Sequence, residues 1–287
     1  MNFRTDLALE RCENLDKKSL EGIKTEILEE NGARITRIEV LNEKGEKTVG
    51  KPMGRYVTVE VAPFARHARF IDDSLEAVAY EIKRMIPENG SVLVAGLGNM
   101  SITPDALGPK CAAMILATRH ITGELLRSTG LTGLRCVSAV ATGVTGETGA
   151  EALEIIKGVV QTVKPDIVIT VDALAARNVE RLGTTIQMCD TGIIPGSGVG
   201  NSRKEISKKT VGVPVISIGV PTVVDAATLI MDCTGNEKSV SHTAECMMVT
   251  PREVDLMIER AAKLTSLAIN CALQPDISPE DMLILTS

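Results

Sequence analysis

The sequence contains no tryptophan, two tyrosines, three phenylalanines and three histidines among its 287 residues. With so few aromatic side chains, a buried core has to be built from Val, Ile, Leu, Ala and Met. Runs rich in Val and Ile suit strands that are buried on both faces of a sheet. The hydrophobic fraction of 44% and the charged fraction of 24% are ordinary for a globular protein. We therefore expect one large core with a smaller appended region.

Several classes of protein are excluded by features that the sequence lacks. No apolar run approaches the roughly 18 to 20 residues that a membrane span needs, and the start of the chain lacks the basic, apolar and small-residue succession of a secretory signal. The net charge of -6 leaves no basic footprint for binding phosphates. We expect a soluble cytoplasmic protein without a membrane partner or a direct nucleic-acid partner.

Metal and disulfide frameworks are also missing. The seven cysteines are odd in number and include no C-x-x-C pair, so we expect them to be reduced and mostly buried. None of the histidines lies in an H-E-x-x-H motif. His242 and Glu245 have helical i, i+3 spacing and could touch a metal, but beside Cys246 they are expected to pack or cap instead. We expect neither a metal nor a cofactor.

The hydrophobic pattern predicts strands that alternate with helices. Residues 33–41 and 56–62 predict a β-hairpin near 32–62, joined by the polar stretch 42–54. Further strands are expected at 91–95, 135–140, 166–171, 184–188 and 213–218, and helices at 74–85, 104–118, 147–163, 225–231 and 251–271. This alternation predicts a three-layer α/β/α architecture with a parallel or mixed sheet, plus the small N-terminal β-hairpin region.

In such sheets the functional site lies beyond the carboxyl ends of the strands. Asp105 follows one strand in a glycine-rich loop, where Thr103 as N-cap and Pro104 at the first position would make Asp105 the second residue of a helix. Asp105 would then either support the helix terminus or act in chemistry. A dinucleotide-binding loop is disfavoured because Ser101 stands where that motif needs glycine.

Asp172 directly follows the apolar run 167–171 of another candidate strand. A carboxylate at that position is costly to bury unless it is paired or hydrogen-bonded, and Arg177 could pair with it as a structural ion pair. Two aspartates on neighbouring loops would also form an acid–base pair, because close carboxyls cannot both ionise and one keeps a proton. Such a pair can activate water against an amide.

The glycine-rich loop 141–149 runs into a predicted helix. Backbone N–H groups around Gly143 and Gly146 could hold a substrate carbonyl or carboxylate, or the loop could be a turn with helix caps. The loop 195–201 is similar, and no G-x-S-x-G nucleophile motif is present.

Several ordered motifs resemble the germination proteases of spore-forming bacteria. They are residues 4–10 (Arg-Thr-Asp-Leu-Ala-Leu-Glu), 94–99, 103–109, 171–177, 195–201 and 269–275. The resemblance implies an aspartic-type endopeptidase with a fold like the hydrogenase-maturation proteases and with Asp105 and Asp172 as its catalytic residues. It also implies a zymogen and homotetramer of the spore core that degrades small acid-soluble spore proteins during germination.

Substrates of that family are cut after an acidic residue that precedes an apolar residue, Ala, any residue and Glu. The chain carries this pattern itself in residues 6–10. The resemblance therefore predicts self-processing between Asp6 and Leu7, with 1–6 as a propeptide and 7–287 as the protease domain.

Two other functions remain open on the sequence alone. One is a metal-dependent hydrolase or a hydrogenase-maturation-type protease that uses Asp105, Asp172 and His242, and chelators would inhibit it. The other is a non-catalytic peptide- or nucleotide-binding protein whose glycine loops hold anions. Such a protein would bind without turnover.

Overall fold

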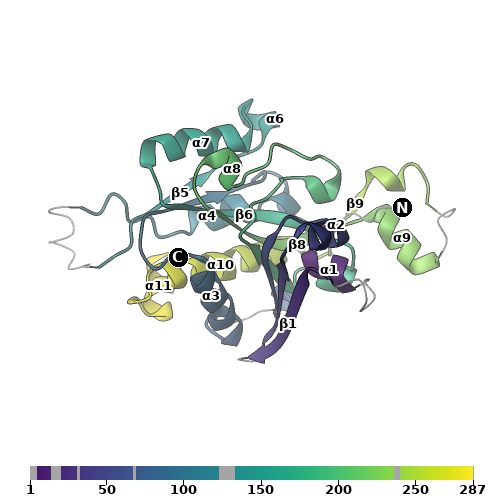
Figure 1. The fold of residues 1–287 in the computed structure, drawn as a ribbon, viewed down its shortest axis with the longest axis horizontal. Helices are drawn as coiled ribbons and strands as arrows, with labels where there is room; N and C mark the ends of the chain where they lie inside the picture. Colours follow the sequence, from purple (N-terminus) through teal and green to yellow (C-terminus); the bar gives the residue numbers. More distant parts are fainter. Residues whose placement is uncertain are drawn as a thin grey trace.

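The computed structural model describes residues 5–13, 21–30, 33–66, 69–122, 133–235 and 240–286. Within these residues a nine-stranded mixed sheet runs through the molecule (Figure 1). Its strands lie in the order β1-β2-β3-β7-β8-β6-β4-β5, and β9 pairs with β8. The strands are β1 (Ile23–Glu30), β2 (Ala33–Val40), β3 (Gly54–Glu60), β4 (Val92–Gly96), β5 (Val137–Ala141), β6 (Ile167–Ala176), β7 (Thr185–Cys189), β8 (Val215–Asp225) and β9 (Met248–Val249).

The sheet has a parallel half and an antiparallel half. Strands β8, β6, β4 and β5 are parallel neighbours, whereas β1, β2, β3, β7 and β8 pair antiparallel. The two strands of the predicted hairpin are β2 and β3, which do pair. Because β3 also pairs with β7, the hairpin extends the main sheet. Its connection, expected to be a turn, contains a short helix that is N-capped by Asn42.

Helices cover both faces of the sheet, which confirms the three-layer α/β/α architecture. In Figure 1, α7 and α8 lie above the sheet and α3, α10 and α11 below it. Successive side chains of β6 point to opposite faces of the sheet, which explains the layers. Ile169 and Val171 belong to the core between the sheet and helices α3 and α10, whereas Val168 belongs to the core between the sheet and α7. The helices are α1 (Ala8–Glu13), α2 (Glu43–Val49), α3 (Asp73–Met85), α4 (Leu107–Ala113), α6 (Thr145–Thr148), α7 (Ala152–Val163), α8 (Lys208–Val211), α9 (Ala226–Thr234), α10 (Val254–Leu273) and α11 (Pro279–Leu285), with 3₁₀ turns at η2 (Phe64–Arg66), η3 (Thr103–Asp105), η4 (Val179–Arg181), η5 (Ser197–Val199) and η7 (Ala244–Cys246).

Two of the predicted helices are shorter than expected. The helix expected at 104–118 is the 3₁₀ turn η3 followed by α4, which ends at Ala113. The helix expected at 147–163 is divided into α6 and α7, because Gly149 takes the left-handed conformation at φ +72° and ends the first of them.

Two of the central strands are longer than expected. Strands β6 and β8 were expected to end at residues 171 and 218, but they remain paired with each other as far as Ala176 and Val224. The backbone N–H and C=O groups of each strand are hydrogen-bonded to the other strand beyond the apolar run, so both strands continue past it. Asp172 therefore lies inside a strand rather than beyond one.

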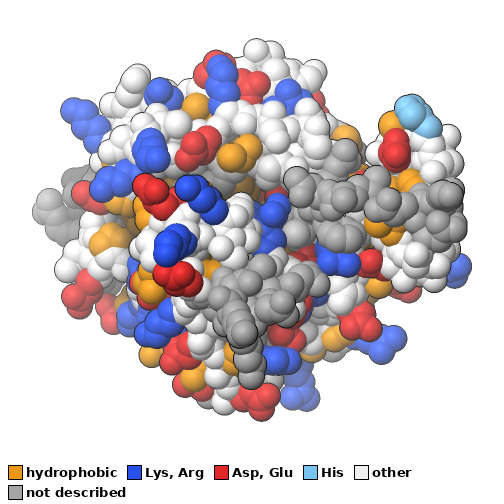
Figure 2. All heavy atoms as spheres, turned by 45° about the vertical axis from the view of Figure 1, so that its right-hand side comes forward, with side chains coloured by type: hydrophobic (Ala, Val, Ile, Leu, Met, Phe, Trp, Pro, Cys, Tyr) orange, Lys and Arg blue, Asp and Glu red, His pale blue; other side chains and the backbone are white. Residues whose placement is uncertain are grey.

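The cysteines are free, as expected, but they are not mostly buried. Cys111 and Cys189 are buried, whereas Cys136, Cys233 and Cys246 are exposed. On the face shown in Figure 2, basic and acidic side chains are interspersed, without the broad basic region that phosphate binding requires. No helix in the described ranges has both the length and the apolarity needed to cross a membrane.

Candidate active site

Asp105 closes the loop between β4 and α4. Its Oδ2 accepts a hydrogen bond of 2.8 Å from the backbone N–H of Asn99. Gly98 turns the chain beside it at φ +106°, where a Cβ would lie 2.2 Å from the Asp105 carbonyl oxygen. The predicted place of Asp105 as the second residue of an α-helix is wrong, because that helix begins only at Leu107. The 3₁₀ turn η3 and the glycine turn at Gly98, and not an α-helix terminus, position this carboxyl group.

Asp172 points out of β6 with only 5% of its surface exposed. Its Oδ1 accepts a hydrogen bond of 2.9 Å from the backbone N–H of Ala173. Arg177, which could have been its structural partner, forms an ion pair of 3.3 Å with Asp232. The carboxyl group is therefore buried with little of the polar compensation that a structural ion pair would give.

One cavity of about 510 Å³ brings the two aspartates together. It is lined by Asp105 and Asp172, by Gly143 and Gly146 of the glycine-rich loop, and by Asp6 of the N-terminal segment. The sequence singled out all five of these residues. Because β4 and β6 are adjacent parallel strands, the carboxyl end of β4 at Gly96 lies beside Val171, directly before Asp172.

The electrostatic environment raises the pKa of both carboxyl groups. Burial raises the pKa of Asp172 well above its ordinary value, and the nearby charges of Asp105 and then Asp6 raise it further, against the Ala173 N–H. Burial also raises the pKa of Asp105, with a smaller contribution from Glu147, while the Asn99 N–H lowers it. Carboxyl groups with raised pKa values hold their protons more tightly than free carboxyls, which suits them to proton transfer.

Asp6 reaches the same cavity from the N-terminal segment. Its backbone N–H donates to the Ala175 carbonyl oxygen at 2.9 Å, and its Oδ2 accepts the Ala175 N–H at 2.9 Å. Its Oδ1 accepts the Ser197 hydroxyl at 2.8 Å. A Cβ on Gly198 would lie 2.1 Å from Oδ2, so the absence of a side chain there makes room for the carboxylate. Residues 1–4 of the predicted propeptide lie outside the described residues.

Glu10 anchors the same segment farther along. Its two carboxylate oxygens accept the backbone N–H groups of Arg177 and Asn178, each at 2.8 Å, and one of them also accepts the Thr5 hydroxyl. Glu10 is only 3% exposed. These donors compensate the burial of a charged group at the end of β6.

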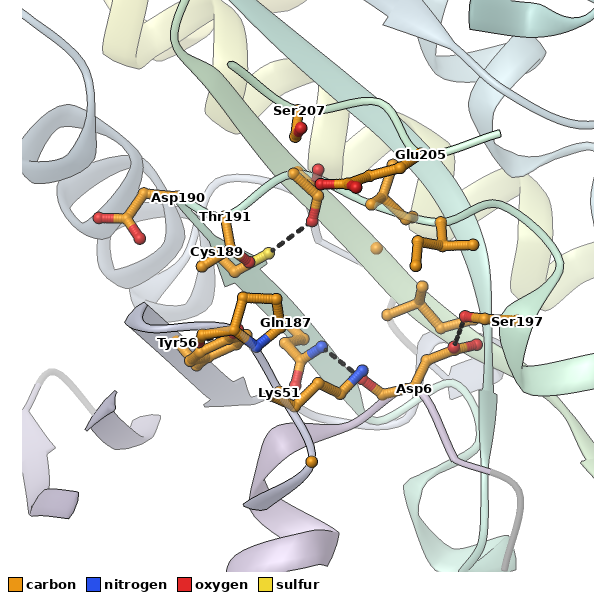
Figure 3. Close-up of a pocket in the computed structure, with 18 of the residues that line it drawn as sticks. Asp6, Lys51, Tyr56, Gln187, Cys189, Asp190, Thr191, Ser197, Glu205 and Ser207 are labelled. Carbon is orange, nitrogen blue, oxygen red and sulfur yellow. Dashed lines mark hydrogen bonds between the residues drawn. The ribbon is translucent and has the colours of Figure 1, made fainter. Parts of the chain in front are cut away.

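A second cavity, of about 830 Å³, adjoins the first and shares Asp6 and Leu174 with it (Figure 3). The side chains of Lys51 and Gln187 point toward Asp6 in this view. Burial lowers the pKa of Lys51, and the negative charge of Asp6 opposes that shift. The N-terminal segment therefore lies between two cavities.

Two of the polar residues that contact Asp6 were not singled out from the sequence. Ser197 lies in the glycine-rich loop 195–201, which the sequence marked as a possible binding loop without predicting a function for Ser197 itself. Gln187 is a lone polar residue in an otherwise apolar part of β7, and that interruption was a signal that it faces something polar. For His242 the structure shows no metal-binding group, since the described ranges contain no cluster of three or more His, Cys, Asp or Glu side chains that could hold an ion.

Comparison with known proteins identifies the family. A family model described as germination protease matches residues 4–236. The chain belongs to the germination protease family. It is 40% identical to the germination protease of Caldanaerobacter subterraneus subsp. tengcongensis, over 98% of this chain and 97% of that protein. It is 46% identical to the germination protease of Priestia megaterium, over 80% of this chain and 66% of that protein.

Membership makes the chain a peptidase, which acts on protein substrates, and confirms the predicted family. Among solved structures, a NiFe hydrogenase maturation protease, HycI from Thermococcus kodakarensis, matches with a TM-score of 0.38 and 17% identity. That match covers 66% of this chain and 98% of the other.

Proposed function

We propose that this peptidase is an aspartic-type endopeptidase in which Asp105 and Asp172 share one proton and activate a water molecule. The observation that carries the proposal is the shared cavity, in which both carboxyls have raised pKa values and the charge of Asp105 contributes to the shift of Asp172. Close carboxyls that cannot both ionise form an acid and a base from the same residue type. The pair titrates as a unit, so its two macroscopic pKa values belong to both residues.

In the proposed reaction the ionised carboxyl takes a proton from water while the water oxygen attacks the scissile carbonyl carbon. The protonated carboxyl then donates its proton to the leaving nitrogen as the C–N bond breaks. The pair ends with one proton, now on the other carboxyl. Backbone N–H groups around Gly143 and Gly146, which line the same cavity, would bind the substrate main chain.

We further propose that the enzyme is made as a zymogen and cleaves itself between Asp6 and Leu7. Support comes from Asp6, whose side chain lines the cavity of the aspartate pair and whose charge acts on Asp172. Substrates with the same acidic residue before the cut, above all small acid-soluble spore proteins, would be cleaved during germination. Removal of the segment before Leu7 would clear the acidic side chain out of the cavity.

Assembly and location form a separate part of the proposal. The mature enzyme would be a homotetramer in the cytoplasm, in the core of the spore. Sedimentation equilibrium of the purified protein tests the assembly, and a monomer at micromolar concentration would contradict it.

The decisive experiment compares wild type with an Asp105→Asn, Asp172→Asn variant. Each is incubated with a peptide containing Thr-Glu-Ile-Ala-Ser-Glu, with and without chelator, and fragments are followed by mass spectrometry. We expect wild type alone to cut after Glu, with chelator having no effect, and to expose Leu7 as a new N-terminus. Replacing either proton-transfer group alone should lower the rate by about 10²- to 10⁴-fold, so the double variant should lose at least that much. Asp276→Asn, at an exposed position, provides the control.

Three outcomes would count against the proposal. Full activity in the double variant would exclude the aspartate pair. Loss of cleavage only with chelator would favour a metal-dependent hydrolase, and binding without any cleavage would favour a peptide-binding protein.

A further inference from the structure

Gln187 contacts the main chain on both sides of the Asp6–Leu7 peptide bond. Its Nε2 donates to the Asp6 carbonyl oxygen at 3.0 Å, and its Oε1 accepts the Ala8 N–H at 2.6 Å (Figure 3). These partners fix the orientation of the amide, because a carbonyl can only accept and a backbone N–H can only donate. The group bonded to the carbonyl is therefore the NH₂ group.

The sheet register places Gln187 level with Asp172. Both residues pair with Gly219 of the intervening strand β8, one from each side. Residues directly opposite each other on adjacent strands point to the same face, so the carboxyl and the amide face the N-terminal segment together. Two strand spacings separate their Cα atoms by roughly 10 Å.

Leu174 fills the space between these two side chains. A Cβ on Gly219 would lie 2.5 Å from Leu174 Cγ, so the glycine leaves room for the leucine. Leu7, which is fully buried, joins Leu174 in one apolar cluster. The residue that follows the bond between Asp6 and Leu7 is thus seated on an apolar surface between a carboxyl and an amide.

The two cavities meet at Asp6, which contributes the carbonyl group of this bond. Asp105 and Asp172 line the smaller cavity, Gln187 lines the larger one, and the cavities share only Asp6 and Leu174. A carbonyl attacked from the side of the aspartate pair would develop its charge where the Gln187 amide already donates. This is the arrangement of a hydrogen-bond donor fixed in advance at an oxyanion.

We propose that Gln187 is a catalytic residue that stabilises the carbonyl oxygen during cleavage of the Asp6–Leu7 bond, and of a peptide bound in the same position. The inference rests on the proposed function. As the water oxygen bonds to the Asp6 carbonyl carbon, the electron pair of the C=O bond moves to the oxygen and the Nε2–H bond strengthens. The pair returns as the C–N bond breaks and the Leu7 nitrogen takes its proton from the aspartate pair.

The chain offers a matched control in Gln274. Its Nε2 donates to the Arg135 carbonyl oxygen and its Oε1 accepts the Arg135 N–H, each at 2.9 Å. Gln274 is 3% exposed and Gln187 7%. Gln274 lines neither cavity. The two glutamines make the same kind of two-pronged contact, and only one of them touches the candidate scissile bond.

The test measures self-cleavage in Gln187→Glu, Gln187→Leu and Gln274→Leu. Gln187→Glu keeps an acceptor for Ala8 but loses the donor to Asp6, and Gln187→Leu loses both. Appearance of the Leu7 N-terminus is timed by mass spectrometry, and unfolding is followed by circular dichroism. We expect both Gln187 variants to be slower by about 10²- to 10³-fold. Gln274→Leu should lower stability while its rate stays close to that of wild type.

A second readout separates catalysis from simple docking. Processed enzyme acts in trans on a synthetic peptide of this chain's residues 1–13. We expect kcat to fall in the Gln187 variants with little change in KM, because the hydrogen bond strengthens only in the transition state. A rise in KM alone, equal slowing in Gln274→Leu, or rates within threefold of wild type would each overturn the role of Gln187.

Failure of the proposed function gives a different pattern. Cleavage that persists in the Asp105→Asn, Asp172→Asn variant would exclude the aspartate pair, whatever the Gln187 variants do. Active aspartate chemistry with normal Gln187 variants would exclude only the role of Gln187. If wild type cleaves neither its own Asp6–Leu7 bond nor the bond after Glu in the test peptide, both proposals are wrong.

Discussion

Two pairs of carboxyl groups, in the N-terminal segment and in the cavity wall, differ in how they are hydrogen-bonded. On the N-terminal segment, Asp6 accepts a backbone N–H and a hydroxyl, and Glu10 accepts two backbone N–H groups and a hydroxyl. In the cavity wall, Asp105 and Asp172 each accept a single backbone N–H. In the proposed mechanism, the number of donors, and not the residue type, separates carboxylates that anchor a segment from carboxyls that transfer protons.

Of these carboxyl groups, Glu10 accepts the most hydrogen bonds, so its removal should have the largest effect on stability. Glu10→Ala leaves the N–H groups of Arg177 and Asn178 without their acceptor, and we expect the free energy of unfolding to fall by about 2–4 kcal/mol. Glu13, on the same helix, makes a half-exposed ion pair with Arg181. Glu13→Ala should therefore cost at most about 1 kcal/mol. Urea unfolding followed by circular dichroism measures both, and equal losses would contradict the distinction.

Substitution of Asp172 in the cavity wall should raise the free energy of unfolding, whereas substitution of Glu10 lowers it. The folded-state pKa of Asp172 is raised, so the native state binds more protons than the unfolded state, and stability falls as pH rises through that pKa. Asp172→Asn removes this penalty. We expect the free energy of unfolding of the variant to exceed that of wild type at pH 8, where the ordinary carboxyl would be ionised. The difference should shrink as pH is lowered toward the ordinary Asp pKa.

Asp166 provides a control with the reverse dependence. It accepts the backbone N–H and the hydroxyl of Ser91, which lower its pKa. Its contribution to stability is present above the ordinary Asp pKa and lost as pH falls through the lowered value. Asp166→Asn should therefore destabilise at neutral pH. If both Asn variants changed stability in the same direction, donor count would not explain the difference between the carboxyls.

The sequence was sufficient to place the aspartate pair but not to place its surroundings. Alternating strands and helices predicted that Asp105 and Asp172 lie at one edge of a sheet, and they do line one cavity, at the carboxyl end of β4. It did not predict that β6 and β8 continue past Asp172, because that depends on main-chain pairing between distant segments. Apolar runs report which residues are buried, and they do not report where a pairing partner ends.

Contacts of the N-terminal segment were beyond any local pattern. Ala8 and Gln187, which share a hydrogen bond, are 179 positions apart, and Asp6 and Ser197 are 191 apart. The motif that contains Asp6 indicated a cut, and the motif that contains Ser197 indicated only a glycine-rich loop. Their meeting is a property of tertiary structure that no periodicity in one sequence expresses.

The space around the Asp6 carboxylate allows a sharper test of the anchoring pair. Gly198→Ala would place a Cβ 2.1 Å from Asp6 Oδ2 and 2.7 Å from Ala175 Cβ, so the carboxylate would have to move. We expect self-cleavage to slow by about 10- to 100-fold, the scale of a displacement near 1 Å. In Gly158→Ala the added Cβ meets nothing within 4 Å, so its rate should match wild type. A normal rate in Gly198→Ala would show that cleavage does not depend on this position of the Asp6 carboxylate.

The smallest expected effect comes from the hydroxyl that holds the other oxygen of Asp6. Ser197→Ala removes one donor but leaves the Ala175 N–H in place, so self-cleavage should slow by about 3- to 10-fold, as for one partly exposed hydrogen bond to a charged group. Ser197→Thr keeps the hydroxyl and should restore most of the rate. In an Asp6→Asn background the loss caused by Ser197→Ala should disappear, because a double-mutant cycle isolates the pairwise interaction. Equal losses in both backgrounds would mean that Ser197 shapes its loop and does not bind the acidic side chain.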